Sequence, residues 1–173
     1  MGVSVFYQGH GGLAEEALLV DGFTFPAPDT IPDAEAAALL IPGHTAHLAL
    51  VRRGALQPGE TLLVLGGAGG TGSAAIQLGR ALGARVLATA SGTERVAFCR
   101  ALGAHHVIDR NDGDVAASVR EHTGGRGADV VFDPVGGDAL ETATRCIAHE
   151  GRILAVGFAS GQDARLSTRH LMT

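Results

Sequence analysis

Residues 61–72 combine an apolar stretch with a glycine pattern that few folds accommodate. The sequence Thr-Leu-Leu-Val-Leu leads directly into glycines spaced Gly-x-Gly-x-x-Gly at Gly67, Gly69 and Gly72, and a helix-forming segment follows. Bare backbone N–H groups and a helix N-terminus placed there can bind a pyrophosphate. We expect Gly67 to form the tight turn, Gly69 to let a ligand approach the backbone, and Gly72 to let helix and strand pack closely.

From residue 61 onward, predicted strands alternate with predicted helices. This alternation is typical of βαβ crossovers, so it predicts an α/β fold: a Rossmann-type doubly wound parallel sheet with helices on both faces. The composition agrees, because 46% of residues are hydrophobic but 4% are aromatic, which favours a core of small aliphatic side chains. Strands are expected at 61–65, 85–90, 106–108, 128–132 and 152–156, and helices at 71–82, 93–102, 114–122 and 138–148.

The first third of the chain follows a different pattern. Two short strands at 3–7 and 16–20 predict a β-hairpin. A helix is expected at 33–40, ended by Pro42 and Gly43, and a second helix at 44–53. We therefore place a short β unit at 1–28 and the main α/β domain at 29–173.

Composition excludes several classes of partner. The formal net charge of −5 argues against binding to nucleic acid or to an anionic membrane surface. Two cysteines do not form a disulfide framework, which favours a reducing, cytoplasmic location. We find neither a signal peptide nor an apolar run of transmembrane length, and we expect no membrane partner.

The residues after the glycine loop and after the second strand favour one dinucleotide. Gly72 is followed by Ser73 and not by Lys, which argues against an ATP-type P-loop. The second strand ends at Ser91 with no acidic residue until Glu94, and a carboxylate there would repel a 2′-phosphate. Ser91 can donate a hydrogen bond and Arg95 can pair with the phosphate, so NADPH is favoured over NADH.

Ser91 also has a purely local explanation. Ser91-Gly92-Thr93-Glu94 spells a capping box, in which the serine side chain starts the following helix and Arg95 is a solvated helix residue. The two interpretations are compatible, since a capping residue can also face a ligand.

The motifs together resemble the medium-chain dehydrogenase/reductase superfamily, and most closely its zinc-independent quinone oxidoreductase (zeta-crystallin-like) branch. The resemblance implies NADPH-dependent hydride transfer to a small-molecule acceptor, a quinone or an activated alkene or carbonyl. An enoyl reductase of the same superfamily and a non-catalytic dinucleotide-binding or interaction module are the alternatives. The residues that carry the resemblance are 36–39, 45–47, 59–64, 67–72, 102–108, 133–136 and 151–157.

The resemblance also assigns cofactor-binding residues. The glycine loop is implied to bind the pyrophosphate, two arginines and a serine the adenosine 2′-phosphate, and the segments after the fourth and fifth strands to line the cofactor groove. A threonine before the sheet is implied to touch the nicotinamide. These residues are Gly67, Ala68, Gly69, Gly70, Thr71 and Gly72 in the loop, Ser91, Arg95 and Arg110 at the phosphate, Val135, Gly136, Gly157 and Phe158 in the groove, and Thr45 at the nicotinamide.

By the same resemblance, no metal is expected. Zinc enzymes of the superfamily have a ligand cysteine where this chain has Ile41, which cannot coordinate a metal. Cys99 and Cys146 fall in predicted helices and are interpreted as small core residues. Residues 1–28 are implied to be the end of a GroES-like catalytic domain, the α/β domain is expected to lack its last strand, and the parent protein is expected to be a homodimer.

Overall fold

The computed structural model describes residues 1–5, 9 and 11–166. The chain divides into two compact units, Met1–Ile41 and Pro42–Thr173. The domain boundary between residues 28 and 29 stays a prediction.

The first unit contains a two-stranded antiparallel pair, as predicted. Strand β1 (Gly2–Ser4) pairs with β2 (Leu19–Thr24), with Gly2 opposite Thr24 and Ser4 opposite Leu19. The second strand begins three residues later than the predicted start at residue 16. Every residue of β2 is exposed. Because neither face of the strand is buried, its sequence has no alternation of apolar and polar residues that would mark its bounds. Residues 6 and 7 of the first predicted strand lie outside the described residues.

The second unit is built on a five-stranded parallel sheet, which confirms the predicted fold class. The spatial order is β5-β4-β3-β6-β7, so the chain starts in the middle, moves outward on one side, and then crosses to the other side of β3. Ligands in such sheets bind beyond the carboxyl ends of the strands, where the order reverses. The strands are β3 (Thr61–Val64), β4 (Arg85–Ala90), β5 (His106–Asp109), β6 (Ala128–Asp133) and β7 (Ile147–Ala155).

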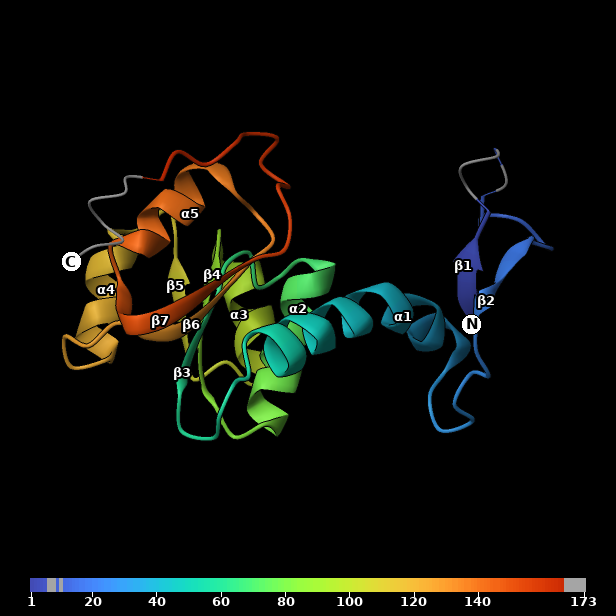
Figure 1. Ribbon diagram of the computed structural model, residues 1–173, viewed down its shortest axis with the longest axis horizontal. Coiled ribbons are helices and arrows are strands. Elements are labelled where there is room, and N and C mark those ends of the chain that lie inside the picture. The colour runs from blue at the N-terminus through green and yellow to red at the C-terminus, as the bar shows by residue number, and fades with distance from the viewer. Residues whose placement is uncertain (6–8, 10, 167–173) are drawn as a thin grey trace. The chain divides into compact units, whose positions relative to one another are not determined.

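Helices cover both faces of this sheet (Figure 1). Helices α2 (Gly70–Ala81) and α3 (Thr93–Ala101) pack on the face that carries Leu62 and Val64. Helices α4 (Val115–His122) and α5 (Gly137–Thr144) pack on the opposite face, with Leu63. Alternate residues of β3 thus enter different core layers, and all of β3 is buried. Strands β3 to β6 and helices α2 to α4 match their predicted bounds to within one residue.

The predicted helix break at Pro42 and Gly43 is wrong. Helix α1 (Asp33–His47) continues through Pro42, and the π-helical turn η2 (Leu48–Arg53) follows it directly. Proline removes one intrahelical hydrogen bond, which packing elsewhere can offset. Here Ala46 and Leu50 are fully buried in the core on the α2 side of the sheet.

Helix α1 and η2 also correct the prediction that no segment has transmembrane length. Residues Asp33–Arg53 form a helical stretch of 21 residues with a mean hydropathy of 1.2, long and apolar enough by these measures to cross a membrane. Core helices of soluble proteins satisfy the same criteria. Ala46, Ala49 and Leu50 of this stretch are buried in the core on the α2 side of the sheet, and 28% of the stretch that meets these criteria is buried.

The last strand begins earlier than predicted. Strand β7 starts at Ile147, within the predicted helix 138–148, because a bulge divides the strand: Ala128 and Val130 of β6 lie opposite Ile147 and Arg152 of β7. Cys146 therefore lies in the turn after α5 and not in a helix, although it is buried as predicted.

Candidate functional site

The turn that follows β3 includes Gly67, as predicted, because the Gly69 N–H donates to the Gly66 carbonyl oxygen at 3.0 Å, but the left-handed residue of the turn is Gly66. Gly66 has a φ of 61°, a conformation that favours glycine, and its N–H donates a hydrogen bond to Thr89 Oγ1 at 3.1 Å. Gly67 is required for space, because an added Cβ would lie 3.0 Å from the Cys99 Sγ, with Ala88 and Ile76 equally close. Sequence reasoning missed Gly66, although the Gly-Gly pair at 66–67 was a signal that either residue could form the turn.

The next two glycines of the pattern have different surroundings. An added Cβ at Gly72 would collide with the Gly66 carbonyl oxygen and lie 2.9 Å from Gly67 Cα, so this glycine lets α2 approach the loop after β3, whereas the predicted close contact was with the strand. An added Cβ at Gly69 would meet a single atom within 4 Å, the Gly66 oxygen at 3.4 Å. Gly69 is the N-cap of α2 and has no side-chain cap, so the helix begins with bare backbone N–H groups beside open space.

A cavity of about 450 Å³ opens over this loop at the carboxyl ends of β3, β4 and β6. It lies where the strand order reverses, which is the expected ligand position in a doubly wound sheet. The described lining residues include Arg95 and Arg110 and no acidic side chain. The full lining is Gly66, Ala68, Gly69, Gly70, Thr71, Thr89, Ala90, Ser91, Arg95, Arg110, Pro134, Val135 and Ala159.

The segment after β4 shows that Ser91 is not a helix cap. The N-cap of α3 is Gly92, with φ 86° and ψ 155°, and it has no side-chain cap hydrogen bond. The capping-box interpretation is therefore wrong. Ser91 lines the cavity together with Arg95 from the first turn of α3 and Arg110 from the residue after β5.

The loops after β6 and β7 are joined beside the cavity. Asp133 is fully buried, and its carboxylate accepts hydrogen bonds from the N–H groups of Val135 at 2.8 Å and Gly136 at 3.0 Å. The Gly157 N–H donates to the Asp133 carbonyl oxygen at 3.2 Å. Asp133, the last residue of β6, thus holds the loops after β6 and β7 together. Val135 lines the cavity, whereas Gly136, Gly157 and Phe158 do not, and Phe158 is 76% exposed.

Thr45 does not line the cavity. It lies in α1, partly buried, and the same helix approaches the loop at Pro42, whose Cγ would be 3.7 Å from a Cβ added at Gly70. Its contact with a nicotinamide stays a prediction.

Several known proteins are similar to this chain in sequence and in fold. A family model described as zinc-binding dehydrogenase matches residues 70–173. The quinone oxidoreductase-like protein 2 homolog of Nematostella vectensis is 37% identical over 163 residues, which is 94% of this chain and 44% of that protein. The chain belongs to the medium-chain dehydrogenase/reductase superfamily.

Two further members of the superfamily bear on the site. The 2-haloacrylate reductase of a Burkholderia species is 39% identical over 131 residues, covering 76% of this chain and 39% of that protein. A mycobacterial protein, solved in complex with NADPH, has a TM-score of 0.81 and 33% identity and covers 88% of this chain and 47% of its own. The chain spans less than half the length of each of these relatives.

The superfamily includes zinc enzymes, so the cysteines and histidines of this member need separate consideration. Among residues 1–5, 9 and 11–166, no cluster of three or more His, Cys, Asp or Glu side chains is arranged to hold a metal ion. Burial raises the pKa of the Cys146 thiol to about 11 and also raises the pKa of Cys99. Since the thiolate is the form that coordinates metal, both thiols are poor ligands. That this member binds no zinc stays a prediction.

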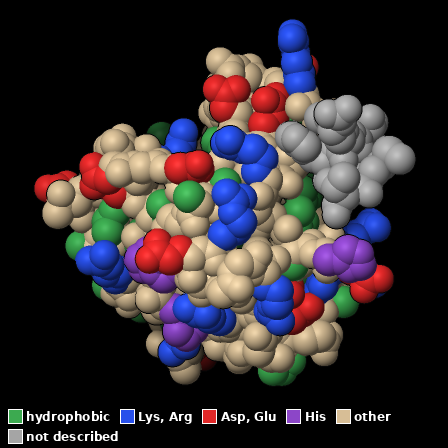
Figure 2. Space-filling model, turned by 90° about the vertical axis from the view of Figure 1, so that its left-hand side faces the viewer, with side chains coloured by type: hydrophobic (Ala, Val, Ile, Leu, Met, Phe, Trp, Pro, Cys, Tyr) green, Lys and Arg blue, Asp and Glu red, His purple; other side chains and the backbone are tan. Residues whose placement is uncertain are grey.

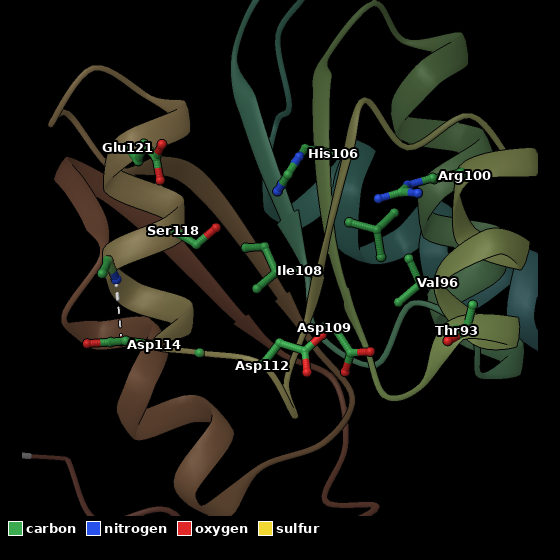
Figure 3. A pocket seen from close by; sticks show the side chains of 13 residues that line it. Thr93, Val96, Arg100, His106, Ile108, Asp109, Asp112, Asp114, Ser118 and Glu121 are labelled. Atoms are coloured by element: carbon green, nitrogen blue, oxygen red, sulfur yellow. Dashed lines mark hydrogen bonds between the residues drawn. The ribbon is translucent and has the colours of Figure 1, made fainter.

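A second cavity, of about 530 Å³, lies between α3, β5 and α4 and shares no lining residue with the first (Figure 3). Arg100 and His106 line one part of it, and Asp109 and Asp112 lie toward its other end. Burial, with a smaller contribution from the stacked His122 ring 3.5 Å away, lowers the pKa of His106. This groove contains no part of the glycine loop, so the loop cavity is the candidate dinucleotide site.

Proposed function

We propose that the chain binds NADPH in the glycine-loop cavity, as the cofactor-binding part of a zinc-independent oxidoreductase. The observation that carries this proposal is the charge of the cavity. Arg95 and Arg110 line it, and Ser91 occupies the end of β4, where an NADH site has a carboxylate for the ribose hydroxyls. An arginine pair beside a hydroxyl suits a phosphate dianion.

Each part of the cofactor has residues suited to hold it. The bare N–H groups at the start of α2 and the open space at Gly69 suit the pyrophosphate. Ser91, Arg95 and Arg110 suit the 2′-phosphate. The bound nicotinamide supplies the hydride, and the protein orients it and limits access of water. For the rest of the site we propose Gly67, Ala68, Gly70, Thr71 and Gly72 in the loop, Val135 in the cavity wall, Gly136, Gly157 and Phe158 in the loops beside the cavity, and Thr45 at the nicotinamide end.

The acceptor is proposed from the relatives. Quinone oxidoreductase-like proteins and a 2-haloacrylate reductase both match, so a quinone or an activated alkene or carbonyl is the acceptor class. An enoyl reductase uses the same hydride chemistry and is the close alternative. A cytoplasmic location and a homodimeric parent protein remain predictions.

Calorimetric titration of the 173-residue chain with NADPH and with NADH tests the cofactor assignment. We expect NADPH to bind more tightly, and Arg95→Ala to weaken NADPH binding by about tenfold or more, because a charge-assisted bond contributes about 1.5–3 kcal/mol. NADH binding is expected to change little in the same variant. Equal affinity of the unmodified chain for both cofactors would contradict the assignment.

Turnover separates the enzyme from a non-catalytic module. NADPH oxidation is followed after addition of a quinone or of an α,β-unsaturated ketone. A chain that binds NADPH but oxidises it with neither acceptor is a binding module, and the hydride-transfer part of the proposal is then wrong for this chain.

A further inference from the structure

Asp109, the last residue of β5, connects the segments that carry the three proposed phosphate ligands. Both of its carboxylate oxygens accept a hydrogen bond from the Gly92 N–H, Oδ1 at 3.2 Å and Oδ2 at 3.1 Å. Oδ1 also accepts from the Asn111 N–H at 3.0 Å. A single side chain therefore joins the start of α3 to the loop that follows β5.

The joined residues are direct neighbours of the phosphate ligands. Gly92 lies between Ser91 and the first turn of α3 that carries Arg95, and it caps α3 in a left-handed conformation with no side-chain cap of its own. On the other side, Arg110 follows Asp109 directly, and its N–H donates to the Ala90 carbonyl oxygen at 2.9 Å. The Asp109–Gly92 hydrogen bonds and the Arg110–Ala90 backbone hydrogen bond thus both join the segments that carry Ser91, Arg95 and Arg110.

The carboxylate itself lines a different cavity from the phosphate ligands. Asp109 lines the groove between α3 and α4, beside Thr93 and Asp112, and is not part of the glycine-loop cavity (Figure 3). The negative charge of Asp109 repels a phosphate and so weakens its binding. The hydrogen bonds that its carboxylate accepts hold the neighbouring segments in place, and this is expected to strengthen phosphate binding. The backbone N–H groups that point at the carboxylate offset part of the charge.

We propose that Asp109 is a positioning residue for NADPH selectivity, because its hydrogen bond with Gly92 holds Ser91, Arg95 and Arg110 in the arrangement that binds a 2′-phosphate. This inference rests on the proposed function. In this role Asp109 accepts hydrogen bonds from the backbone next to the phosphate ligands and does not itself contact the cofactor.

Two substitutions separate acceptor geometry from charge. Asp109→Ala removes every acceptor, whereas Asp109→Asn keeps an Oδ1 for Gly92 and Asn111 and removes the charge. We expect Asp109→Ala to weaken NADPH binding by about tenfold and NADH binding by less than about twofold, and Asp109→Asn to bind NADPH at least as tightly as the unmodified chain.

Asp112→Ala is the matched control, since Asp112 is an exposed carboxylate of the same groove that makes no side-chain bond to Gly92. It is expected to leave both affinities unchanged. Thermal unfolding followed by circular dichroism checks that each variant folds. If Asp109→Ala does not fold, Asp109→Asn still decides: an affinity for NADPH well below that of the unmodified chain overturns the proposal.

The remaining outcomes are also distinct. Equal losses of NADPH and NADH affinity in a folded Asp109→Ala variant would show a general structural role and overturn the inference, while leaving the proposed function intact. Absence of NADPH preference in the unmodified chain would overturn the proposed function itself, and the inference with it.

Discussion

Gly69 is the N-cap of α2 and Gly72 lies in its first turn, yet a methyl group at each is expected to have a different effect. At Gly72 the added Cβ would collide with the backbone of the loop, which cannot move aside without displacing β3 or α2. We expect Gly72→Ala to lower the free energy of unfolding by about 2 kcal/mol. At Gly69 the Cβ would enter the open side of the loop, so Gly69→Ala should cost less than about 1 kcal/mol.

Gly69→Ala, the more stable of the two variants, is expected to lose dinucleotide affinity. In Gly69→Ala the methyl group occupies the space proposed for the pyrophosphate, so dinucleotide affinity should fall by about tenfold or more in a stable protein. Urea unfolding and cofactor titration of both variants provide the two measurements. A Gly69→Ala variant that binds as tightly as the unmodified chain would place the pyrophosphate elsewhere.

At the residue scale, the sequence predicted where the site lies but not the conformations of the residues within it. The Gly-x-Gly-x-x-Gly pattern located the loop, and the missing acid after β4 located the arginine-lined end of the cavity. It did not show which of Gly66 and Gly67 takes the left-handed conformation, since both lie in the same turn and the φ of 61° belongs to Gly66. Nor did it resolve Ser91, because a capping box and a ligand-facing serine have the same sequence.

Among the elements, β7 is joined to the turn before β3 by a bidentate ion pair. Arg152 Nη1 and Nη2 donate to the Glu60 carboxylate at 2.9 and 2.6 Å, and Arg152 Nε donates to the Gly54 carbonyl oxygen at 2.9 Å. The hydrogen bond from Arg152 is the main cause of the lowered pKa of Glu60. Side-chain exposures of 35% for Arg152 and 22% for Glu60 leave the pair partly screened by solvent.

Glu60→Gln is expected to lower the free energy of unfolding at pH 7 by about 1 kcal/mol, after allowance for that screening. Because the folded-state pKa lies below the ordinary value of 4.5, the contribution is complete above pH 4.5 and is lost as the pH falls through the folded-state pKa. The stabilities of the unmodified chain and the variant should therefore converge in acid. Urea unfolding across the acid range measures this.

Arg126→Ala is the control for the ion pair, since Arg126 pairs with Asp129 at 3.1 Å with 65% of its side chain exposed. Its removal should change stability by less than about 0.5 kcal/mol. A constant difference between the unmodified chain and Glu60→Gln at every pH would mean that packing, and not the ion pair, accounts for the effect.

The bounds of helices and strands were predictable where a regular pattern of apolar residues reflects burial against the sheet or between the helix layers. Strands β3 to β6 and helices α2 to α4 have such a pattern, because each strand is buried between two helix layers. The start of β7 was missed because a bulge with Glu150 at φ 58° interrupts the strand, and residues 147 and 148 were included in the predicted helix 138–148. The continuation of α1 through Pro42 was missed because local propensity predicts a break that core packing overrides.

At the scale of the whole molecule, side chains of both charges are mixed on the face that Figure 2 shows, and both cysteine thiols are buried. On the face in Figure 2, Arg side chains are interspersed with Asp and Glu, and that face shows no basic stripe of the kind that binds nucleic acid. Cys99 and Cys146 are 0% and 1% exposed, and they lie in the two different core layers, on opposite faces of the sheet. Reaction of each thiol therefore reports opening of its own layer.

If the sheet and both helix layers unfold as one cooperative unit, a thiol reagent should modify both cysteines at the same rate in native buffer. The variants Cys99→Ala and Cys146→Ala, each with one remaining thiol, provide the two rates. NADPH at about 100 times its dissociation constant should slow both by about 100-fold, because it binds the folded state alone. Faster modification of Cys146 than of Cys99 would show that the α4 and α5 layer opens by itself, whereas the layer beneath the glycine loop, where the Cys99 Sγ lies close to Gly67, stays closed.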